Sequence, residues 1–289
     1  MQFPADFTAR EQALLGPRFA ELYAYATPQP ACGVTVNGLR CTPEWFAAHA
    51  DFAAALSPFC PTAFTTAPDF KPGRHPWHHA GVFYAQEPSA SAPAALLDVH
   101  PGMKVADLCA APGGKSFSAA FAMEDKGEIV SCDLHENKLK RIQEGAARLD
   151  LTSITTSAGD GRVFRPEWAE RFDTVLVDAP CSGLGIIRKK PDVRYKKADD
   201  LFTLPVIQTA LLDNAARYVA PGGVLVYSTC TILPEENEQV TDAFLTEHSD
   251  FCRDGFTLPA PVGETEGQLT LWPQRHGTDG FYICRMKRT

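Results

Sequence analysis

Residues 103–133 read MKVADLCAAPGGKSFSAAFAMEDKGEIVSCD, and this stretch decides the fold. It begins with Met103 to Leu108, a mostly apolar segment that predicts a short strand. A glycine-rich turn follows and opens a helix rich in Ala and Phe, and residues 128–132 then predict a second strand that ends at Asp133. A strand, a tight turn, a helix and a second strand make a βαβ unit, in which the two strands are parallel.

The same alternation continues toward the C-terminus. Helical spacing is found over residues 137–149 and, with an interruption at Pro205, over residues 199–219. Further strands are predicted at residues 153–157, 174–177, 223–227 and 281–284. Repeated βα units predict an α/β fold, with a mainly parallel sheet that carries helices on both faces.

The first 95 residues have a different pattern. Residues 5–25 have helical spacing, residues 33–38 predict a short strand that ends in a turn, and Thr42-Pro43-Glu44 is a helix start. Residues 58–93 hold seven prolines and little periodicity, so we expect a long connection packed on the main domain. The sequence therefore predicts two domains, residues 1–95 and residues 96–289.

Composition excludes several classes of protein. Of the 289 residues, 45% are hydrophobic and 21% are charged, which is ordinary for a soluble protein and argues against a disordered or fibrous chain. No apolar run reaches the ~18 residues of a membrane span, and the first residues do not resemble a secretory signal. The number of cysteines, nine, is odd, and no signal peptide is recognised, so we expect reduced thiols and a cytoplasmic location. No C-x-x-C pair occurs among them, so we expect no zinc. A net charge of -8 argues against a nucleic-acid-binding surface over the whole protein, but it leaves room for a local basic groove.

The glycine-rich turn predicts a ligand site. Glycines at such a turn let the backbone approach a ligand, and the free N–H groups of the following helix face the same crevice. The turn is not a P-loop, because the position five residues before Gly114-Lys115 is Cys109 and not glycine. The dinucleotide pattern G-x-G-x-x-G is also absent. The local Gly-Gly-Lys-Ser is therefore only weak evidence for a nucleotide triphosphatase.

Acidic residues follow three of the predicted strands. Asp133 lies twenty residues after Gly113, Asp160 follows the strand at 153–157, and Asp178 follows the strand at 174–177. The carboxyl ends of parallel strands meet at one crevice, where a carboxylate accepts hydrogen bonds from the hydroxyls of a ribose. Each aspartate alone is equally well explained as a helix cap. Three of them around one turn favour an adenosine-containing ligand.

Two cysteines lie at predicted strand tips. Cys181 is part of Asp178-Ala179-Pro180-Cys181-Ser182-Gly183, and Cys230 is part of Ser228-Thr229-Cys230-Thr231. Both thiols are expected beside the bound cofactor. A free cysteine more often packs as a small buried hydrophobe. We expect that simpler role for Cys32, Cys60, Cys132, Cys252 and Cys284.

These segments resemble the Nol1/Nop2/Sun family of RNA cytosine-C5 methyltransferases, which use S-adenosyl-L-methionine, and among them the bacterial 16S ribosomal RNA branch. The family's Ala-Pro-Gly-Gly-Lys turn matches Ala111 to Lys115, and its Asp-x-Pro-Cys-Ser-Gly segment matches Asp178 to Gly183. Its Thr-Cys pair matches Thr229 and Cys230, with Pro-Glu-Glu-Asn-Glu at 234–238 and Gly-Thr-Asp-Gly-Phe at 277–281. The resemblance covers at least residues 95–289, and more loosely residues 73–86.

The resemblance implies a Rossmann-like class I methyltransferase fold with a mainly parallel seven-stranded sheet, preceded by a small, mostly helical N-terminal domain. Residues 1–95 would be an α+β region with an RNA-binding or accessory role. Cytosine C5 is a weak nucleophile, and a thiolate that adds at C6 makes it reactive enough to accept a methyl group. The resemblance implies that Cys230 is this nucleophile and that Cys181 assists product release. No metal is needed.

The resemblance also implies roles around the crevice. Asp178 would hydrogen-bond the cytosine edge, and Lys115 would contact either the base or the cofactor carboxylate. Asp133 would hold the ribose and Asp160 the adenine, with the turn holding the methionine part. The expected cofactor-binding residues are Cys109, Ala110, Ala111, Pro112, Gly113, Gly114, Lys115, Asp133, Asp160 and Asp178.

A basic segment follows Cys181 and predicts RNA contact. Its residues are Arg188, Lys189, Lys190, Arg194, Lys196 and Lys197, with Tyr195 among them. Basic side chains with an aromatic ring suit a phosphate track and a stacked base, although a charge run alone is more often a solvated loop. A second, weaker patch consists of Lys71, Arg74, His75, His78 and His79. Family members usually continue into C-terminal RNA-binding modules, whereas this sequence ends at Thr289, just after its last predicted strand.

The predicted function is methylation of C5 of an RNA cytosine. Ribosomal RNA is the expected partner, within a ribosomal subunit or free, and we expect a monomer with no membrane contact. Transfer RNA is the alternative substrate. Two other classes remain open: an amino-methyltransferase that needs no thiol, and an RNA-binding assembly factor without catalysis. The first would stay active without Cys230, and the second would not need an intact cofactor turn.

Overall fold

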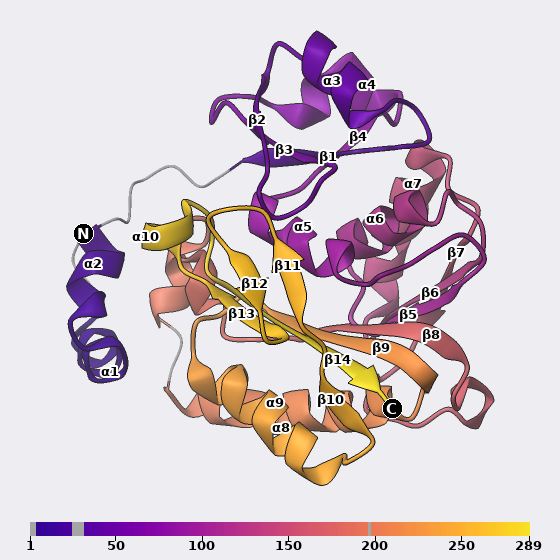
Figure 1. Cartoon of the computed structure of the whole chain (residues 1–289). Helices are drawn as coiled ribbons and strands as arrows, with labels where there is room; N and C mark the ends of the chain where they lie inside the picture. Colours follow the sequence, from indigo (N-terminus) through magenta and orange to yellow (C-terminus); the bar gives the residue numbers. More distant parts are fainter. Residues whose placement is uncertain (1–3, 25–31, 196–197) are drawn as a thin grey trace.

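A computed structural model describes residues 4–24, 32–195 and 198–289. Its centre is a sheet with the strand order β10-β14-β9-β8-β5-β6-β7, on which β13 pairs with β14 as an eighth strand (Figure 1). The strands are β5 (Lys104–Asp107), β6 (Glu128–Asp133), β7 (Ile154–Ala158), β8 (Phe172–Asp178), β9 (Val219–Thr229), β10 (Phe251–Arg253), β13 (Gln268–Leu271) and β14 (Phe281–Arg288). The pairs from β9 to β7 are parallel, and β14 is antiparallel to its neighbours. The predicted α/β fold with a mainly parallel sheet is confirmed.

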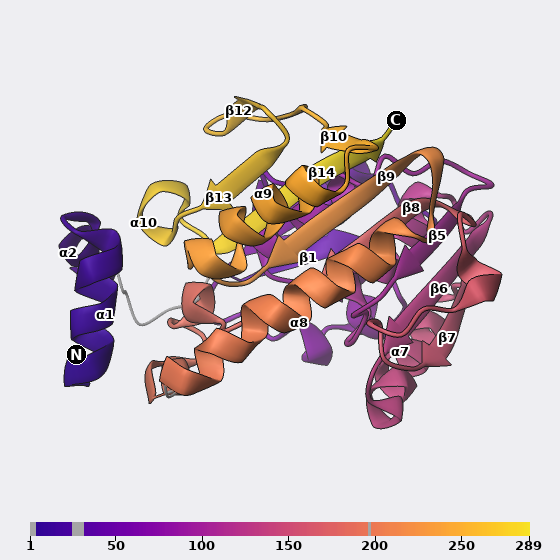
Figure 2. The ribbon, with the colours of Figure 1, turned by 90° about the horizontal axis from the view of Figure 1, so that it is seen from below.

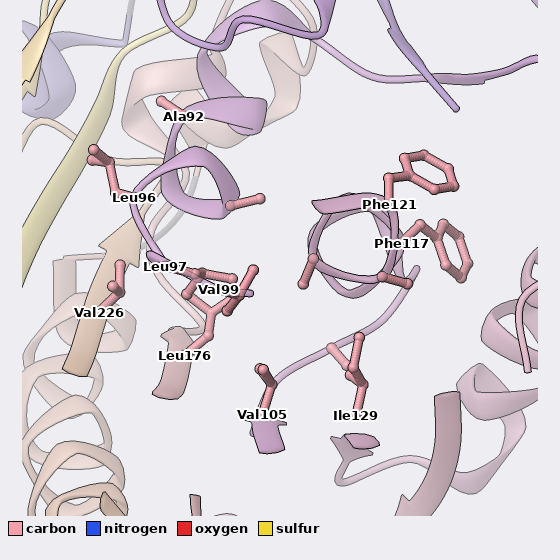
Figure 3. Packing of buried hydrophobic residues seen from close by; sticks show 14 of the residues in the cluster. Ala92, Leu96, Leu97, Val99, Val105, Phe117, Phe121, Ile129, Leu176 and Val226 are labelled. Carbon is pink, nitrogen blue, oxygen red and sulfur yellow. The ribbon is translucent and has the colours of Figure 1, made fainter. Parts of the chain in front are cut away.

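Helices cover both faces of this sheet, as apolar residues on both sides of its strands require. The covering helices are α5 (Pro88–Ala95), α6 (Gly114–Ala122) and α7 (Glu136–Leu149) on one face, and α8 (Ala198–Ala216) and α9 (Glu238–Glu247) on the other. Figure 2 shows α8 and α9 lying along the sheet. In Figure 3, Phe117 and Phe121 of α6 lie near Val105 and Ile129 of the sheet. The core is thus divided by the sheet into two layers.

The N-terminal region has its own sheet, β2-β3-β1-β4, which is antiparallel throughout. Its elements are α1 (Ala5–Leu15), α2 (Arg18–Ala24), β1 (Gly33–Val36), α3 (Pro43–His49), β2 (Ala53–Leu56), β3 (Ala63–Thr66), η1 (Pro72–Arg74), α4 (Pro76–His79) and β4 (Phe83–Ala85). The expectation of a long connection over residues 58–93 was wrong. Three prolines of this stretch stand in first helical turns, where a missing N–H costs nothing, and its strands are only three or four residues long.

The remaining short elements lie in the connections between these strands and helices. They are η2 (Pro166–Trp168), η3 (Leu184–Ile186), η4 (Pro191–Tyr195), η5 (Pro234–Glu236), β11 (Phe256–Leu258), β12 (Gly263–Thr265) and α10 (Pro273–His276). An apolar cluster joins α1, through Phe7 and Leu15, and α2, through Leu22, to Leu184 after β8 and Ile232 after β9. The N-terminal helices therefore pack on the two loops that carry Cys181 and Cys230. Within the described ranges, none of the helices is long and apolar enough to cross a bilayer.

Candidate active site

Strand register brings the two cysteine loops together. β8 and β9 are parallel neighbours, and Asp178 stands opposite Ser228 in their register. Cys181 and Cys230 follow these residues at the same edge of the sheet, and their sulfur atoms are 3.2 Å apart. The predicted proximity of the two thiols is therefore observed. Both side chains are only partly buried, as a reacting group must be.

Close backbone contacts hold the two loops in place. The Gly185 N–H donates to the carbonyl of Cys230 at 3.0 Å, and the Gly280 N–H donates to the carbonyl of Gly185 at 2.8 Å. A Cβ atom on Gly185 would lie 2.1 Å from the Gly280 oxygen and 2.8 Å from the Cys230 oxygen. Only glycine permits this approach. A side-chain contact of 2.7 Å between Ser182 Oγ and Thr231 Oγ1 joins the loops a second time.

The two thiols differ in electrostatics. The hydrogen bond from Cys181 lowers the pKa of Cys230 against the effect of burial, and the cations Lys115 and Lys190 lower it further. The same hydrogen bond, together with burial and the negative charge of Glu236, holds the pKa of Cys181 well above its ordinary value. Of the two thiols, Cys230 is therefore the one whose surroundings favour the thiolate form.

A partly buried ion pair stands beside Cys230. Lys115 Nζ lies 2.6 Å from Asp178 Oδ2, and the Ser228 hydroxyl donates to Asp178 Oδ1 at 2.7 Å. Burial disfavours the charged amine, yet the Asp178 carboxylate raises the pKa of Lys115, which therefore stays a cation. Nζ also lies 5.3 Å from the centroid of the Phe281 ring. The contact of Lys115, which the sequence left open between base and cofactor, is with the Asp178 carboxylate.

A cavity of about 370 Å³ lies at the tips of β5, β6 and β8. Its lining includes the three predicted aspartates, Asp133, Asp160 and Asp178. Asp133 accepts the N–H of His135 at 3.0 Å, and Asp160 forms an ion pair with Arg162 at 2.7 Å. Apolar walls from Leu108, Leu134, Ile207 and Leu211 complete the cavity. This combination of carboxylates and apolar walls fits an adenosine, so the residues fit S-adenosyl-L-methionine.

A second cavity, of about 240 Å³, continues from the first, because Cys109, Ala111 and Asp178 line both. The glycine-rich turn forms one wall, and the N-terminal region forms the other through Tyr84 and Gln86. A Cβ atom on Gly114 would lie 2.9 Å from the Tyr84 ring and 3.0 Å from the Gln86 amide nitrogen. Sequence reasoning missed Tyr84 and Gln86, because their contact with the turn is set by tertiary packing and not by local pattern.

Asp107 at the tip of β5 is a further site residue that sequence reasoning missed. It lines the second cavity, is 2% exposed, and accepts the hydroxyl of Ser116 at 2.7 Å. Its Oδ1 is buried and has no hydrogen-bond partner among the residues that the structure describes. Burial raises the pKa of Asp107 to about 7. Its position directly before the glycine-rich turn was the available signal.

The predicted RNA-binding residues differ in their surroundings. Arg188 is buried, and its guanidinium lies 3.3 Å from the buried carboxylate of Asp279. Lys189 and Lys190 are exposed, and Lys189 lines the second cavity. Arg194 donates to the Pro191 carbonyl at 2.7 Å and its guanidinium carbon lies 5.6 Å from the centroid of the Tyr195 ring, which is 64% exposed. Lys196 and Lys197 lie outside the described residues.

The residues of the weaker patch also differ in how far they are exposed. Lys71, Arg74 and His79 are exposed. His75 is partly buried, and its ring packs among Phe52, Phe70, Trp77 and Phe83. His78 is also partly buried, and burial lowers its pKa.

Fold and site together define the class: a Rossmann-like class I methyltransferase, the S-adenosyl-L-methionine-dependent type, with two cysteines at its centre. A family model described as 16S rRNA methyltransferase RsmB/F matches residues 94–287, and one described as the N-terminal domain of 16S rRNA methyltransferase RsmF matches residues 3–88. The chain belongs to the RsmB/F family of 16S rRNA methyltransferases.

Individual relatives agree with this assignment. The chain is 46% identical over 215 residues to a probable ribosomal RNA small subunit methyltransferase B of Bacillus subtilis (strain 168), a match that covers 72% of this chain and 48% of the relative. It is 33% identical over 242 residues to the ribosomal RNA small subunit methyltransferase F of Shewanella amazonensis (strain ATCC BAA-1098 / SB2B), covering 80% and 52%. The chain thus spans about half the length of these relatives. A crystal structure of a methyltransferase homolog protein from Pyrococcus horikoshii superposes with a TM-score of 0.84 at 28% identity, over 99% of this chain and 96% of that one.

Proposed function

We propose that this chain transfers a methyl group from S-adenosyl-L-methionine to C5 of a cytosine in RNA, through a covalent bond between Cys230 and C6 of the base. The carrying observation is the pair of sulfurs 3.2 Å apart at neighbouring strand tips, of which Cys230 alone has its pKa lowered. A methyltransferase for amino groups needs no thiol. Two thiols with opposite pKa shifts beside a cofactor cavity fit the addition chemistry of a pyrimidine ring.

The first half of the reaction uses Cys230. Its thiolate adds to C6, and the electron pair of the C5=C6 bond becomes available at C5. When bound, S-adenosyl-L-methionine supplies a methyl group made electrophilic by its sulfonium. C5 takes that methyl group, and the sulfonium sulfur keeps the electron pair of the broken bond. Asp178, held by Lys115 and Ser228, is placed to hydrogen-bond the polar edge of the cytosine.

The second half releases the product. A base removes the C5 proton, the pair of the C5–H bond forms the C5=C6 double bond, and the C6–S bond breaks. Its electron pair returns to Cys230 as a thiolate. Cys181, the group beside Cys230, serves this step after its own proton has passed to solvent, and its thiolate then accepts the C5 proton. Its raised pKa makes that thiolate a strong base.

The cofactor residues keep their predicted roles in this proposal. Asp133 holds the ribose and Asp160 lies by the adenine, both in the larger cavity. The backbone from Cys109 to Gly114 holds the methionine part, and Tyr84 and Gln86 close that end of the crevice. The target base must leave its stack to reach the cysteines. Exposed Lys189 and Lys190 are placed to hold the RNA backbone beside it.

Small-subunit ribosomal RNA is the proposed substrate, because both relatives named above are ribosomal RNA small subunit methyltransferases. The substrate is free RNA or RNA within a ribosomal subunit, and the protein acts as a monomer in the cytoplasm. The nine cysteines all lie within the described residues and form no disulfide bond there, which is compatible with a reducing compartment.

Labelled-methyl transfer tests the proposal. The protein is mixed with labelled S-adenosyl-L-methionine and unmodified small-subunit ribosomal RNA, which is then digested to nucleosides. Label in 5-methylcytidine that disappears with Cys230→Ser supports both the reaction and the nucleophile. If label appears only with transfer RNA, transfer RNA and not ribosomal RNA is the substrate. Label in another nucleoside that survives Cys230→Ser would contradict the thiol mechanism.

A further inference from the structure

Glu236 is a buried carboxylate that the reaction described above does not use. It ends η5, six residues after Cys230, and is 1% exposed. Its Oε2 accepts the Ser182 N–H at 2.9 Å and the amide of Gln208 at 2.8 Å. The same Gln208 amide donates to the Pro180 carbonyl at 2.9 Å. Glu236 therefore holds the backbone on both sides of Cys181.

The backbone of Glu236 is itself fixed to the sheet. Its carbonyl accepts the Tyr227 hydroxyl at 2.7 Å, and Tyr227 is a buried residue of β9. The chain of contacts runs from β9 through Glu236 to the loop after β8. The Cys181 loop is thus held in place from the neighbouring strand, and not only by its own.

Burial of the Glu236 carboxylate destabilises the fold. A buried carboxylate is destabilising unless its oxygens are well paired, and Oε1 of Glu236 has no hydrogen-bond partner among the residues that the structure describes. One oxygen of this side chain, Oε2, accepts both converging donors, from Ser182 and Gln208. An apolar side chain at this position would leave both donors without this acceptor.

Cys230 has a separate support. Thr229 donates its hydroxyl to Asn237 Oδ1 at 2.6 Å, and the Asn237 amide donates to the Thr231 carbonyl at 3.1 Å. Asn237 therefore bridges the residues on both sides of Cys230, as Glu236 and Gln208 do for Cys181. Two adjacent residues of one segment each serve a different cysteine. A change at Glu236 should affect the step that depends on Cys181.

We propose that Glu236 is a positioning residue for product release: it fixes the Pro180–Ser182 backbone so that the Cys181 sulfur stands beside the adduct on Cys230. This inference rests on the proposed function. Glu236 forms no bond to the substrate and moves no proton in it. Its loss slows the elimination that frees the methylated base more than it slows the addition to C6.

Glu236→Leu tests this with a neighbouring control. The leucine side chain has a similar size but no acceptor, so the contacts with the Ser182 N–H and the Gln208 amide are both lost. We expect release slower by about tenfold or more, with a smaller effect on adduct formation, since small misplacements of reacting groups have effects of this size. The protein–RNA adduct then accumulates on a denaturing gel, as it should with Cys181→Ala. Glu235→Leu, the same change at the exposed adjacent glutamate, should leave the adduct transient.

The outcomes separate the inference from the function beneath it. If Cys181→Ala accumulates adduct and Glu236→Leu does not, the inference is wrong while the proposed function stands. Equal losses in formation and release would also contradict it, because they indicate general damage. No adduct with Cys181→Ala and no 5-methylcytidine from the unchanged protein would instead reject the proposed function.

A second variant keeps the inference testable if Glu236→Leu does not fold. Gln208→Leu leaves Glu236 and its bond to Ser182 in place and removes the contact with Pro180. We expect slower release than in the unchanged protein, with a smaller accumulation of adduct than in Cys181→Ala. Normal release in Gln208→Leu would then count against the inference by itself.

Discussion

The loop after β8 and the loop after β9 carry the same reactive group in opposite surroundings. Cys181 lies on the side of Glu236, whose charge raises the pKa of its thiol after the effects of Cys230 and of burial. Cys230 receives a hydrogen bond from Cys181, and Lys115 and Lys190 add positive charge on its side. The surroundings therefore favour the protonated thiol at Cys181 and the thiolate at Cys230, although the two sulfurs are in contact.

The comparison separates two contributions of the fold. Parallel pairing of β8 and β9 brings the thiols together, because Asp178 and Ser228 share a register position just before them. Pairing alone would leave the sulfurs equivalent. Their difference comes from residues elsewhere in the chain, Lys115 at the start of α6 and Glu236 in η5.

Exchanging each cysteine in turn should give the largest effect. Cys230→Ser removes the nucleophile, so we expect product formation to fall by roughly 10³-fold or more, with no adduct. Cys181→Ala should also yield little product, but with adduct retained. Gel analysis of RNA-bound protein distinguishes the two. Retained adduct in Cys230→Ser would reverse the assignment.

Gly185→Ala should separate the loops. The added Cβ would meet backbone oxygens of Gly280 and Cys230 that cannot move aside easily. We expect a loss of about 3 kcal/mol in the free energy of unfolding, typical of overpacking against backbone. Chemical denaturation measures it. Gly73→Ala is the control, since nothing lies within 4 Å of its Cβ position. Equal stability of the two variants would contradict the close approach.

Lys115→Met should reduce the difference between the thiols. The hydrogen bond from Cys181 and the positive charge of Lys115 both lower the pKa of Cys230, while the Asp178 carboxylate raises it. Without the cation the pKa rises, so less thiolate exists at neutral pH. The pH profile of Cys230 alkylation by iodoacetamide, mapped by peptide mass spectrometry, should move to higher pH. Lys140→Met, on the exposed face of α7, should leave it unchanged.

Lys190→Ala should have the smallest effect. Lys190 is exposed, so its effect on the thiolate is screened by solvent and salt. We expect RNA affinity to fall by a few-fold, with the slope of log affinity against log salt reduced by about one. Binding titrations at several salt concentrations measure this. An unchanged slope would indicate that Lys190 does not contact the RNA.

Sequence predicted the parts of the site that depend on local pattern. Strand periodicity located the tips that carry Asp133, Asp178 and Cys230, since parallel strands end at one edge. It could not predict contacts set by tertiary packing. Arg188 was expected on the RNA-binding surface, and the structure pairs it in the interior with Asp279, 91 residues later. Tyr84 lies on a strand too short for its period to be recognised.

Trapping the adduct tests the central claim most directly. RNA that carries 5-fluorocytidine at the target has no C5 proton to lose, so the adduct formed after methyl transfer should persist. The complex is digested, and peptide mass spectrometry locates the modified cysteine. We predict attachment to Cys230 alone. Attachment to Cys181, or methyl transfer without any attachment, would contradict the assignment of the two thiols.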